Sequence, residues 1–190
     1  MTDIDSLVAH EDPRSVIFIN GKGGVGKTEL GMALERRGFR RIELDEVIRG
    51  LIVPGHPCGD DVFQLYRPGK YQAEKQQLVA AVGPISDRTV IVGSIRDPEL
   101  FTALSAGRPS LLIYVQPADE ESYRNAIRLR ARRDAGRTLG FLADAIAQHA
   151  PLSRVAAQQY ALIPKNRALV LSLPASRTRT YFSVVPAPAL

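Results

Sequence analysis

The 190-residue chain has little of what several classes of protein require. Its single cysteine, Cys58, excludes an internal disulfide and fits a reducing compartment. No apolar run approaches the length of about 18 residues that a membrane-spanning helix needs, and residues 1–12 are acidic rather than signal-like. The sequence shows no cluster of metal-ligating side chains and no Ser–His–Asp set. These features together predict a cytoplasmic protein.

The chain also has fewer acidic than basic residues, and its formal net charge is +5. Much of the excess lies in one segment, at Arg124, Arg128, Arg130, Arg132, Arg133 and Arg137. A basic protein attracts polyanions in general, and nucleotides, phosphorylated coenzymes and nucleic acids all qualify. The charge therefore indicates an anionic ligand without choosing among these three.

The strongest pattern that is present is a phosphate-binding loop. Residues 21–28 match G-x-x-x-x-G-K-[ST] at every fixed position, with a short apolar strand predicted before them and a helix over 28–37 after them. Glycines allow a tight turn whose N–H groups face phosphate oxygens, and the helix start adds positive potential. The residues expected to hold ATP are Gly21, Lys22, Gly23, Gly24, Val25, Gly26, Lys27 and Thr28.

Two residues of this loop have chemical roles of their own. The motif predicts that the Lys27 ammonium reaches the β- and γ-phosphates and that the Thr28 hydroxyl binds Mg²⁺. Lys27 is thus also a predicted catalytic residue, and ATP and Mg²⁺ are the predicted cofactors.

Strands and helices alternate along the rest of the chain. Apolar runs predict strands over 15–20, 41–44, 89–95, 110–115 and 168–173, with an edge strand over 181–185. Helical patterns cover 71–82, 98–106, 119–134, 138–149 and 152–160, and a short helix is predicted near 61–66. Asp97 and Pro98 form a helix start, with Asp97 as the N-cap. This order predicts an α/β fold: a doubly wound, mostly parallel sheet with the phosphate site at the carboxyl ends of its strands.

The predicted organisation is one domain with two ends outside it. Residues 1–14 are expected to be a flexible leader, residues 15–173 the folded domain, and residues 174–190 a tail. Within the domain, residues 45–82 are the expected acceptor-binding segment and residues 119–149 the expected helical lid.

One resemblance is confined to the loop. Lys22-Gly23-Gly24-Val25-Gly26-Lys27-Thr28 resembles the K-G-G-x-G-K-T loop of ParA/MinD-like ATPases. In that family the first lysine reaches a nucleotide phosphate, often across a dimer. The family's acidic strand end is missing, since residues 92–95 read Val-Gly-Ser-Ile and the next Asp is Asp97.

A second resemblance extends from Val16 to Asn166. Residues 42–49 resemble the I-D-A-D-x-I-A-R segment of nucleoside-monophosphate-kinase-like proteins, and in particular of dephospho-CoA kinase. Asp97-Pro98-Glu99-Leu100-Phe101 follows a buried strand as the family's P-L-L-F-E does. Residues 124–134 resemble the arginine-rich lid helix, and residues 146–151 and 161–166 resemble the closing segments. The outline also suits viral and archaeal deoxynucleotide-kinase-like proteins.

This resemblance implies a division of labour among the charged residues. Asp45 matches the second acidic position and Arg49 the arginine of the segment, while Glu43 replaces its first Asp. Glu43, Asp45 and Arg49 are therefore the expected acceptor-binding residues, with Asp45 also catalytic. Arg128 and Arg132 are four residues apart on one helix face and are expected to stabilise the migrating phosphoryl group.

The function predicted from the sequence is transfer of the γ-phosphoryl group of ATP·Mg to a nucleotide-like small molecule. A nucleoside or deoxynucleoside monophosphate and dephospho-CoA are the acceptor types expected, and the enzyme is expected to be a monomer or homodimer. Two alternatives stay open at this point: a ParA/MinD-like partner-switching ATPase and a kinase acting on nucleic acid. The missing acidic strand end disfavours the first, and the lack of basic stretches interleaved with aromatics disfavours the second.

Overall fold

The structure is a computed structural model. It describes residues 12–21, 24–51, 69–85, 88–95, 97–117, 121, 123–125, 127–128, 168–173 and 183–186. The strands are β1 (Val16–Gly21), β2 (Arg40–Glu43), β3 (Thr89–Val92), β4 (Ser110–Pro117), β5 (Ala168–Leu173) and β6 (Ser183–Pro186). The helices are α2 (Lys27–Glu35), α3 (Leu44–Leu51), α4 (Gln72–Val82) and α5 (Pro98–Ser105), and residues 121–128 include further helical turns.

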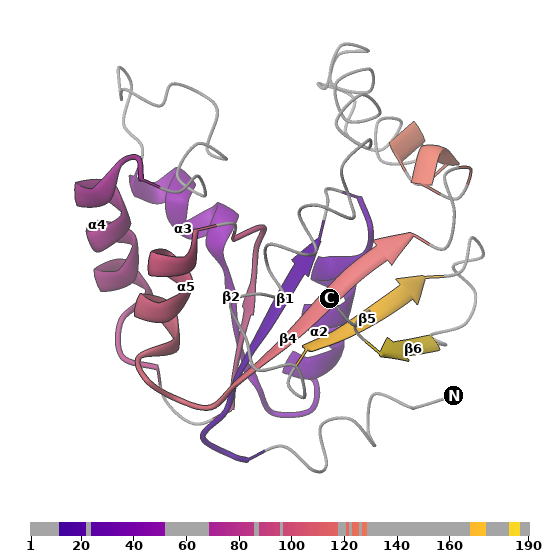
Figure 1. Ribbon diagram of the computed structural model, residues 1–190, viewed down its shortest axis with the longest axis horizontal. Coiled ribbons are helices and arrows are strands. Elements are labelled where there is room, and N and C mark those ends of the chain that lie inside the picture. The colour runs from indigo at the N-terminus through magenta and orange to yellow at the C-terminus, as the bar shows by residue number, and fades with distance from the viewer. Residues whose placement is uncertain are drawn as a thin grey trace.

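These strands form one sheet in the order β2-β3-β1-β4-β5-β6 (Figure 1). The first five are parallel, and β6 pairs antiparallel with β5 at the edge. The register of β1 places Phe18 beside Ile91 of β3 and Leu112 of β4. The predicted parallel sheet and its predicted edge strand are both confirmed. Loops that follow parallel strands leave the sheet at the carboxyl ends of those strands. In α/β proteins, ligands bind at this side of the sheet.

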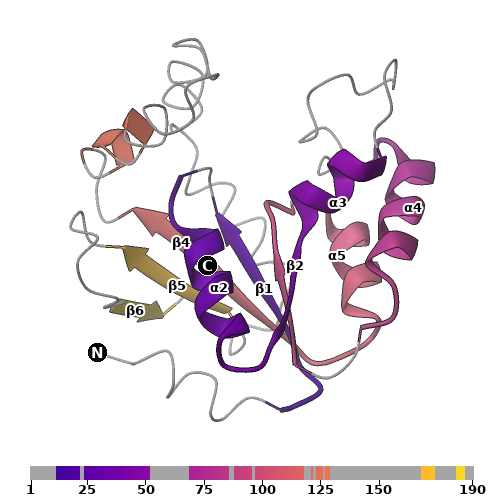
Figure 2. The same cartoon turned by 180° about the vertical axis from the view of Figure 1, so that it is seen from behind.

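Helices cover both faces of the sheet. On one face, alternate strand residues such as Phe18 and Leu112 pack against α3, α4 and α5. On the other, Ile17, Ile113 and their neighbours pack against α2 and against Tyr123 and Ile127 of the later helical turns. Figures 1 and 2 show this division, with α3, α4 and α5 together on one side and α2 in front when the molecule is viewed from behind. The doubly wound α/β fold is confirmed.

Local sequence signals explain where several helices begin and end. Asp97 caps α5, because its Oδ1 accepts a hydrogen bond from the Glu99 N–H at 3.1 Å and Pro98 occupies the first turn. After α2, Gly38 adopts a positive φ of 88°, as expected of the glycine that ends a helix. The Asp97–Pro98 helix start was predicted from sequence.

Two strands end earlier than predicted. Strand β3 ends at Val92 rather than Ile95, because the chain beyond it bonds to the end of β1: the Asn20 side chain donates to the Ile95 carbonyl at 3.2 Å. Strand β2 ends at Glu43, and α3 begins at Leu44 without an intervening loop. Asp45 therefore lies in the first turn of α3.

Other predicted elements lie outside the described residues. These are the helix near 61–66, the helices over 138–149 and 152–160, residues 1–11 of the leader and most of the expected lid. Among the helices of the described part, none combines the length and apolar character needed to cross a membrane.

Candidate active site

The phosphate-binding loop lies at the carboxyl end of β1, the central strand of the parallel sheet. Gly24 and Gly26 have φ angles of 83° and 90°, in the left-handed region that residues with a Cβ rarely adopt. A Cβ on Gly24 would lie 2.8 Å from Cδ1 of Ile127, so this turn also packs tightly against the later helical turns. Lys22 and Gly23 lie outside the described residues.

Lys27 is the first residue of α2, and its side chain turns back over the loop. Its Nζ donates a hydrogen bond to the Gly21 carbonyl at 2.8 Å, across the turn that the glycines make. Gly26, the N-cap of α2, has no side chain to cap the first N–H groups of the helix. Thr28 is exposed in that first turn. A lysine, a helix start without a capping side chain and an exposed hydroxyl thus meet at one point, as a phosphate and its cation require.

The end of β3 packs directly behind this loop. Gly93 N–H donates to the Ile19 carbonyl at 3.0 Å, and the Ser94 hydroxyl donates to the Gly21 carbonyl at 2.8 Å. Ser94 is buried, and its bond to the loop was not predicted from the sequence. The only signal was indirect: a small polar residue stands where the sequence lacks the expected acidic strand end.

Asp45 lies at the same edge of the sheet, beyond β2. It is half-buried in the first turn of α3, and Arg49 is exposed one turn later. The spacing of four residues places both on one side of the helix. Figure 1 shows α3 beyond the carboxyl end of β2, on the sheet face opposite to α2. The structure therefore brings the loop and Asp45 to one edge from opposite faces.

Glu43 has a different environment from Asp45. Its neighbour Ile42 packs on the α3–α5 face, so alternation turns Glu43 toward the face that α2 covers. There its carboxylate accepts a hydrogen bond from the Arg41 guanidinium at 2.6 Å, and Arg41 also contacts Glu35 of α2 at 3.0 Å. Burial raises the pKa of Glu43 above its usual 4.5, against the opposing effect of Arg41. Glu43 and Asp45 thus lie on different sides of the sheet edge.

Lys75 and Asp97 form an ion pair that sequence reasoning missed. Both side chains are almost fully buried, and Lys75 Nζ bonds to Asp97 Oδ2. Nearby, Gln72 Nε2 donates to Glu99 Oε2 at 2.8 Å, so two polar links join the first turns of α4 and α5. One signal existed: Lys75 stands three and seven residues before the core residues Leu78 and Val82, on the buried face of α4.

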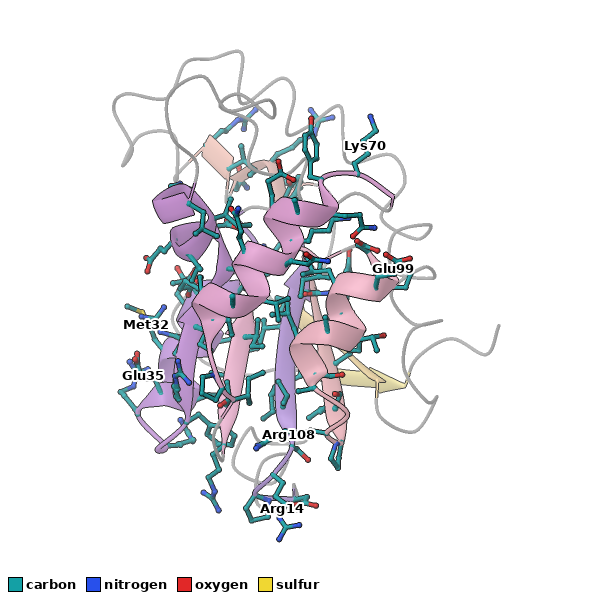
Figure 3. The ribbon with its side chains drawn as sticks, turned by 90° about the vertical axis from the view of Figure 1, so that its left-hand side faces the viewer. Arg14, Met32, Glu35, Lys70, Glu99 and Arg108 are labelled. Atoms are coloured by element: carbon teal, nitrogen blue, oxygen red, sulfur yellow. The ribbon has the colours of Figure 1, made fainter. Side chains whose placement is uncertain are left out.

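The basic helix is described only in its first part. Tyr123 and Ile127 are buried against the α2 side of the core, while Arg124 and Arg128 are exposed. In Figure 1 these turns lie beyond the carboxyl end of β4, at the edge that carries the loop. Arg132 lies outside the described residues. Two other arginines are remote from the site: Figure 3 shows Arg14 and Arg108 at the opposite end of the molecule from Lys70 and Glu99.

Comparisons with known proteins find distant similarities among solved structures. No protein-family model and no curated protein matches the chain. Among solved structures, shikimate kinase from Bacteroides thetaiotaomicron is similar at 16% identity and TM-score 0.48, over 87% of this chain and 90% of that one. A gluconokinase from Sinorhizobium meliloti 1021 is similar at 18% identity and TM-score 0.40, covering 85% and 84%. A sugar kinase from Janibacter sp. HTCC2649 is similar at 17% identity and TM-score 0.43, covering 86% of each.

The architecture itself is set by the strand order and by the position of the loop. Five parallel strands carry helices on both faces, and the glycine-rich turn joins the central strand β1 to α2. The chain accordingly has the α/β fold of a doubly wound, mostly parallel sheet with a phosphate-binding loop.

Proposed function

We propose that the protein is an ATP-dependent phosphotransferase that acts on a small molecule. The observation that carries the proposal is that Lys27 and Asp45 follow the parallel strands β1 and β2 at one edge of the sheet. Strand β3 lies between these two strands, and its own end bonds to the phosphate loop. Phosphoryl transfer needs two groups from the protein: a cation that binds the donor phosphates and a carboxylate that orients the acceptor.

ATP and Mg²⁺ fit the residues present. The left-handed turn at Gly24 and Gly26, the uncapped start of α2 and the Lys27 ammonium together favour a chain of phosphates at this point. The Thr28 hydroxyl, exposed in the same helical turn, would be a ligand of Mg²⁺. When bound, ATP supplies the phosphoryl group that is transferred. The protein's part is to hold the donor and to neutralise charge through Lys27.

The acceptor would bind between α3 and the loop. The Asp45 carboxylate would hold an attacking hydroxyl of the acceptor in line and accept its proton, whereas an acceptor phosphate would attack as an anion with no proton to give up. Arg49, exposed one turn further on the same side of α3, would pair with an anionic group of the acceptor. An acceptor with both a nucleophilic oxygen and a negative charge, such as a nucleoside monophosphate or dephospho-CoA, matches that pair of residues.

Glu43 would contribute less directly than Asp45. Its carboxylate is already bonded to Arg41 on the face that α2 covers. Arg128, exposed on the helix that packs over Gly24, would approach the migrating phosphoryl group when the basic helix closes, and Arg132 would lie one turn further on. Closure of this helix would also keep water from taking the phosphoryl group.

A panel assay tests the proposal. The protein is incubated with ATP labelled in the γ-phosphate, Mg²⁺ and one acceptor at a time: nucleoside and deoxynucleoside monophosphates, dephospho-CoA, shikimate, sugars or an oligonucleotide. A labelled small molecule supports the proposal, and a labelled oligonucleotide would favour a kinase acting on nucleic acid instead. Label found only in inorganic phosphate, together with dimerisation on adding ATP, would favour the partner-switching ATPase.

A further inference from the structure

The carbonyl oxygen of Gly21 accepts hydrogen bonds from two side chains that belong to different elements. One is the Lys27 ammonium, from the start of α2, at 2.8 Å. The other is the Ser94 hydroxyl, from the segment after β3, also at 2.8 Å. A carbonyl has two lone pairs and can hold both donors at once. Lys27 and Ser94 thus meet at the first residue of the phosphate loop.

Gly21 lies where β1 and β4 approach each other closely. Its φ is 150°, and a Cβ at this position would lie only 2.3 Å from the Val115 carbonyl of β4. Gly21 is itself buried and pairs in register with Val115. Because Gly21 is buried, its carbonyl oxygen needs a hydrogen-bond donor there.

Ser94 is held in place on both sides. The preceding Gly93 N–H bonds to the Ile19 carbonyl at 3.0 Å, and the following Ile95 carbonyl accepts the Asn20 side-chain amide at 3.2 Å. Both contacts join this segment to β1, the strand that ends in the loop. Ser94 is buried, with 8% of the residue exposed, so water does not readily replace its hydroxyl.

The two donors differ in whether they also contact a bound nucleotide. Lys27 must turn its ammonium toward the β- and γ-phosphates, whereas Ser94 has no such second task. We propose that Ser94 is a positioning residue of the phosphate loop: its hydroxyl keeps the buried Gly21 carbonyl bonded when Lys27 leaves it for the nucleotide. This inference rests on the proposed function, because it concerns the same nucleotide site.

The first test measures ATP affinity by calorimetry in the presence of Mg²⁺. Ser94→Ala leaves the carbonyl bare only in the bound state, so the affinity should fall about tenfold, equivalent to about 1.4 kcal/mol. Ser94→Thr, which keeps the hydroxyl, should restore it. Ser105→Ala is the matched control, because Ser105 is a buried serine that bonds to a carbonyl of α5, at Thr102, away from the loop. Equal affinities for Ser94→Ala and the wild type would overturn the proposal.

The second test needs no nucleotide. In the free protein either donor can serve the carbonyl, so Ser94→Ala and Lys27→Met should each lower the urea midpoint only slightly. The double variant should lose more than the sum of the two, since it leaves the carbonyl with neither donor. Additive losses would overturn the inference even if ATP binds. A wild type that binds no ATP would contradict the proposed function itself, and the double-mutant cycle would still report whether the carbonyl is shared.

Discussion

The side chains of Lys75 and Asp97 form an ion pair in which each residue is at most 3% exposed. Removing one partner of such a pair leaves the other charge buried and unpaired. Lys75→Met should therefore lower the free energy of unfolding by about 3–5 kcal/mol, measured by urea denaturation. Gln72→Ala, which removes an exposed link between the same two helices, should cost far less.

A second variant separates the stranded charge from lost packing. Adding Asp97→Asn to Lys75→Met removes the charge but keeps an oxygen that can cap α5 at Glu99. The double variant should therefore be more stable than Lys75→Met alone. If it is less stable, the cost of the single change lies in packing around Lys75 and not in the pair.

Lys27 should carry most of the nucleotide affinity. Lys27→Ala removes the ammonium that lies over the loop, and the affinity for ATP·Mg should fall by about two powers of ten, since charge-assisted bonds to phosphate are lost. Calorimetry with Lys70→Ala as the control checks this, because Lys70 is exposed and outside the loop. An unchanged affinity in Lys27→Ala would contradict the assignment of the loop.

Asp45 and Arg128 should affect turnover in different ways. Arg128→Ala should lower kcat by about 10²–10³ if the guanidinium meets the phosphoryl group in transfer, whereas Arg108→Ala, at the far end of the molecule, should leave kcat unchanged.

Asp45→Asn keeps the shape of the side chain, so it should slow transfer while ATP affinity stays near the wild-type value. Normal transfer by Asp45→Asn would exclude Asp45 from the acceptor site.

The stability of the protein should depend on pH through Glu43. Burial raises the pKa of this carboxyl above 4.5, so its contribution is fully present below that pH and is lost as the pH rises through the higher folded-state value. The stability of the wild type relative to Glu43→Gln should therefore fall as the pH rises above 4.5 and through the raised folded-state pKa of Glu43. Urea unfolding at several pH values measures it, with Glu35→Gln, the exposed partner of Arg41, as the control. A difference that grows with pH would contradict this account.

The parts of the site that sequence predicts are the local ones. The loop can be predicted because its glycines, Lys27 and the flanking strand and helix are consecutive in the chain. The Asp97–Pro98 helix start can be predicted for the same reason. Each depends on turn and capping preferences of residues that are neighbours in the chain.

The contacts that sequence reasoning missed join residues far apart in the chain. Ser94 reaches Gly21 only because β3 pairs with β1 although β2 comes between them in the sequence. Lys75 meets Asp97 because α4 and α5 lie on the same face of the sheet. Strand order and helix placement decide such pairs, and hydrophobic patterns alone do not specify them.

The most direct test of the central claim is where the γ-phosphoryl group goes. Wild type and Lys27→Ala are compared with labelled ATP·Mg, with and without the acceptor that the panel identifies, and the label is counted in the acceptor and in inorganic phosphate. The account predicts that the wild type places most of the label on the acceptor, releases little phosphate without it, and loses transfer in Lys27→Ala. Label that goes to inorganic phosphate at the same rate whether or not any acceptor is present would contradict it.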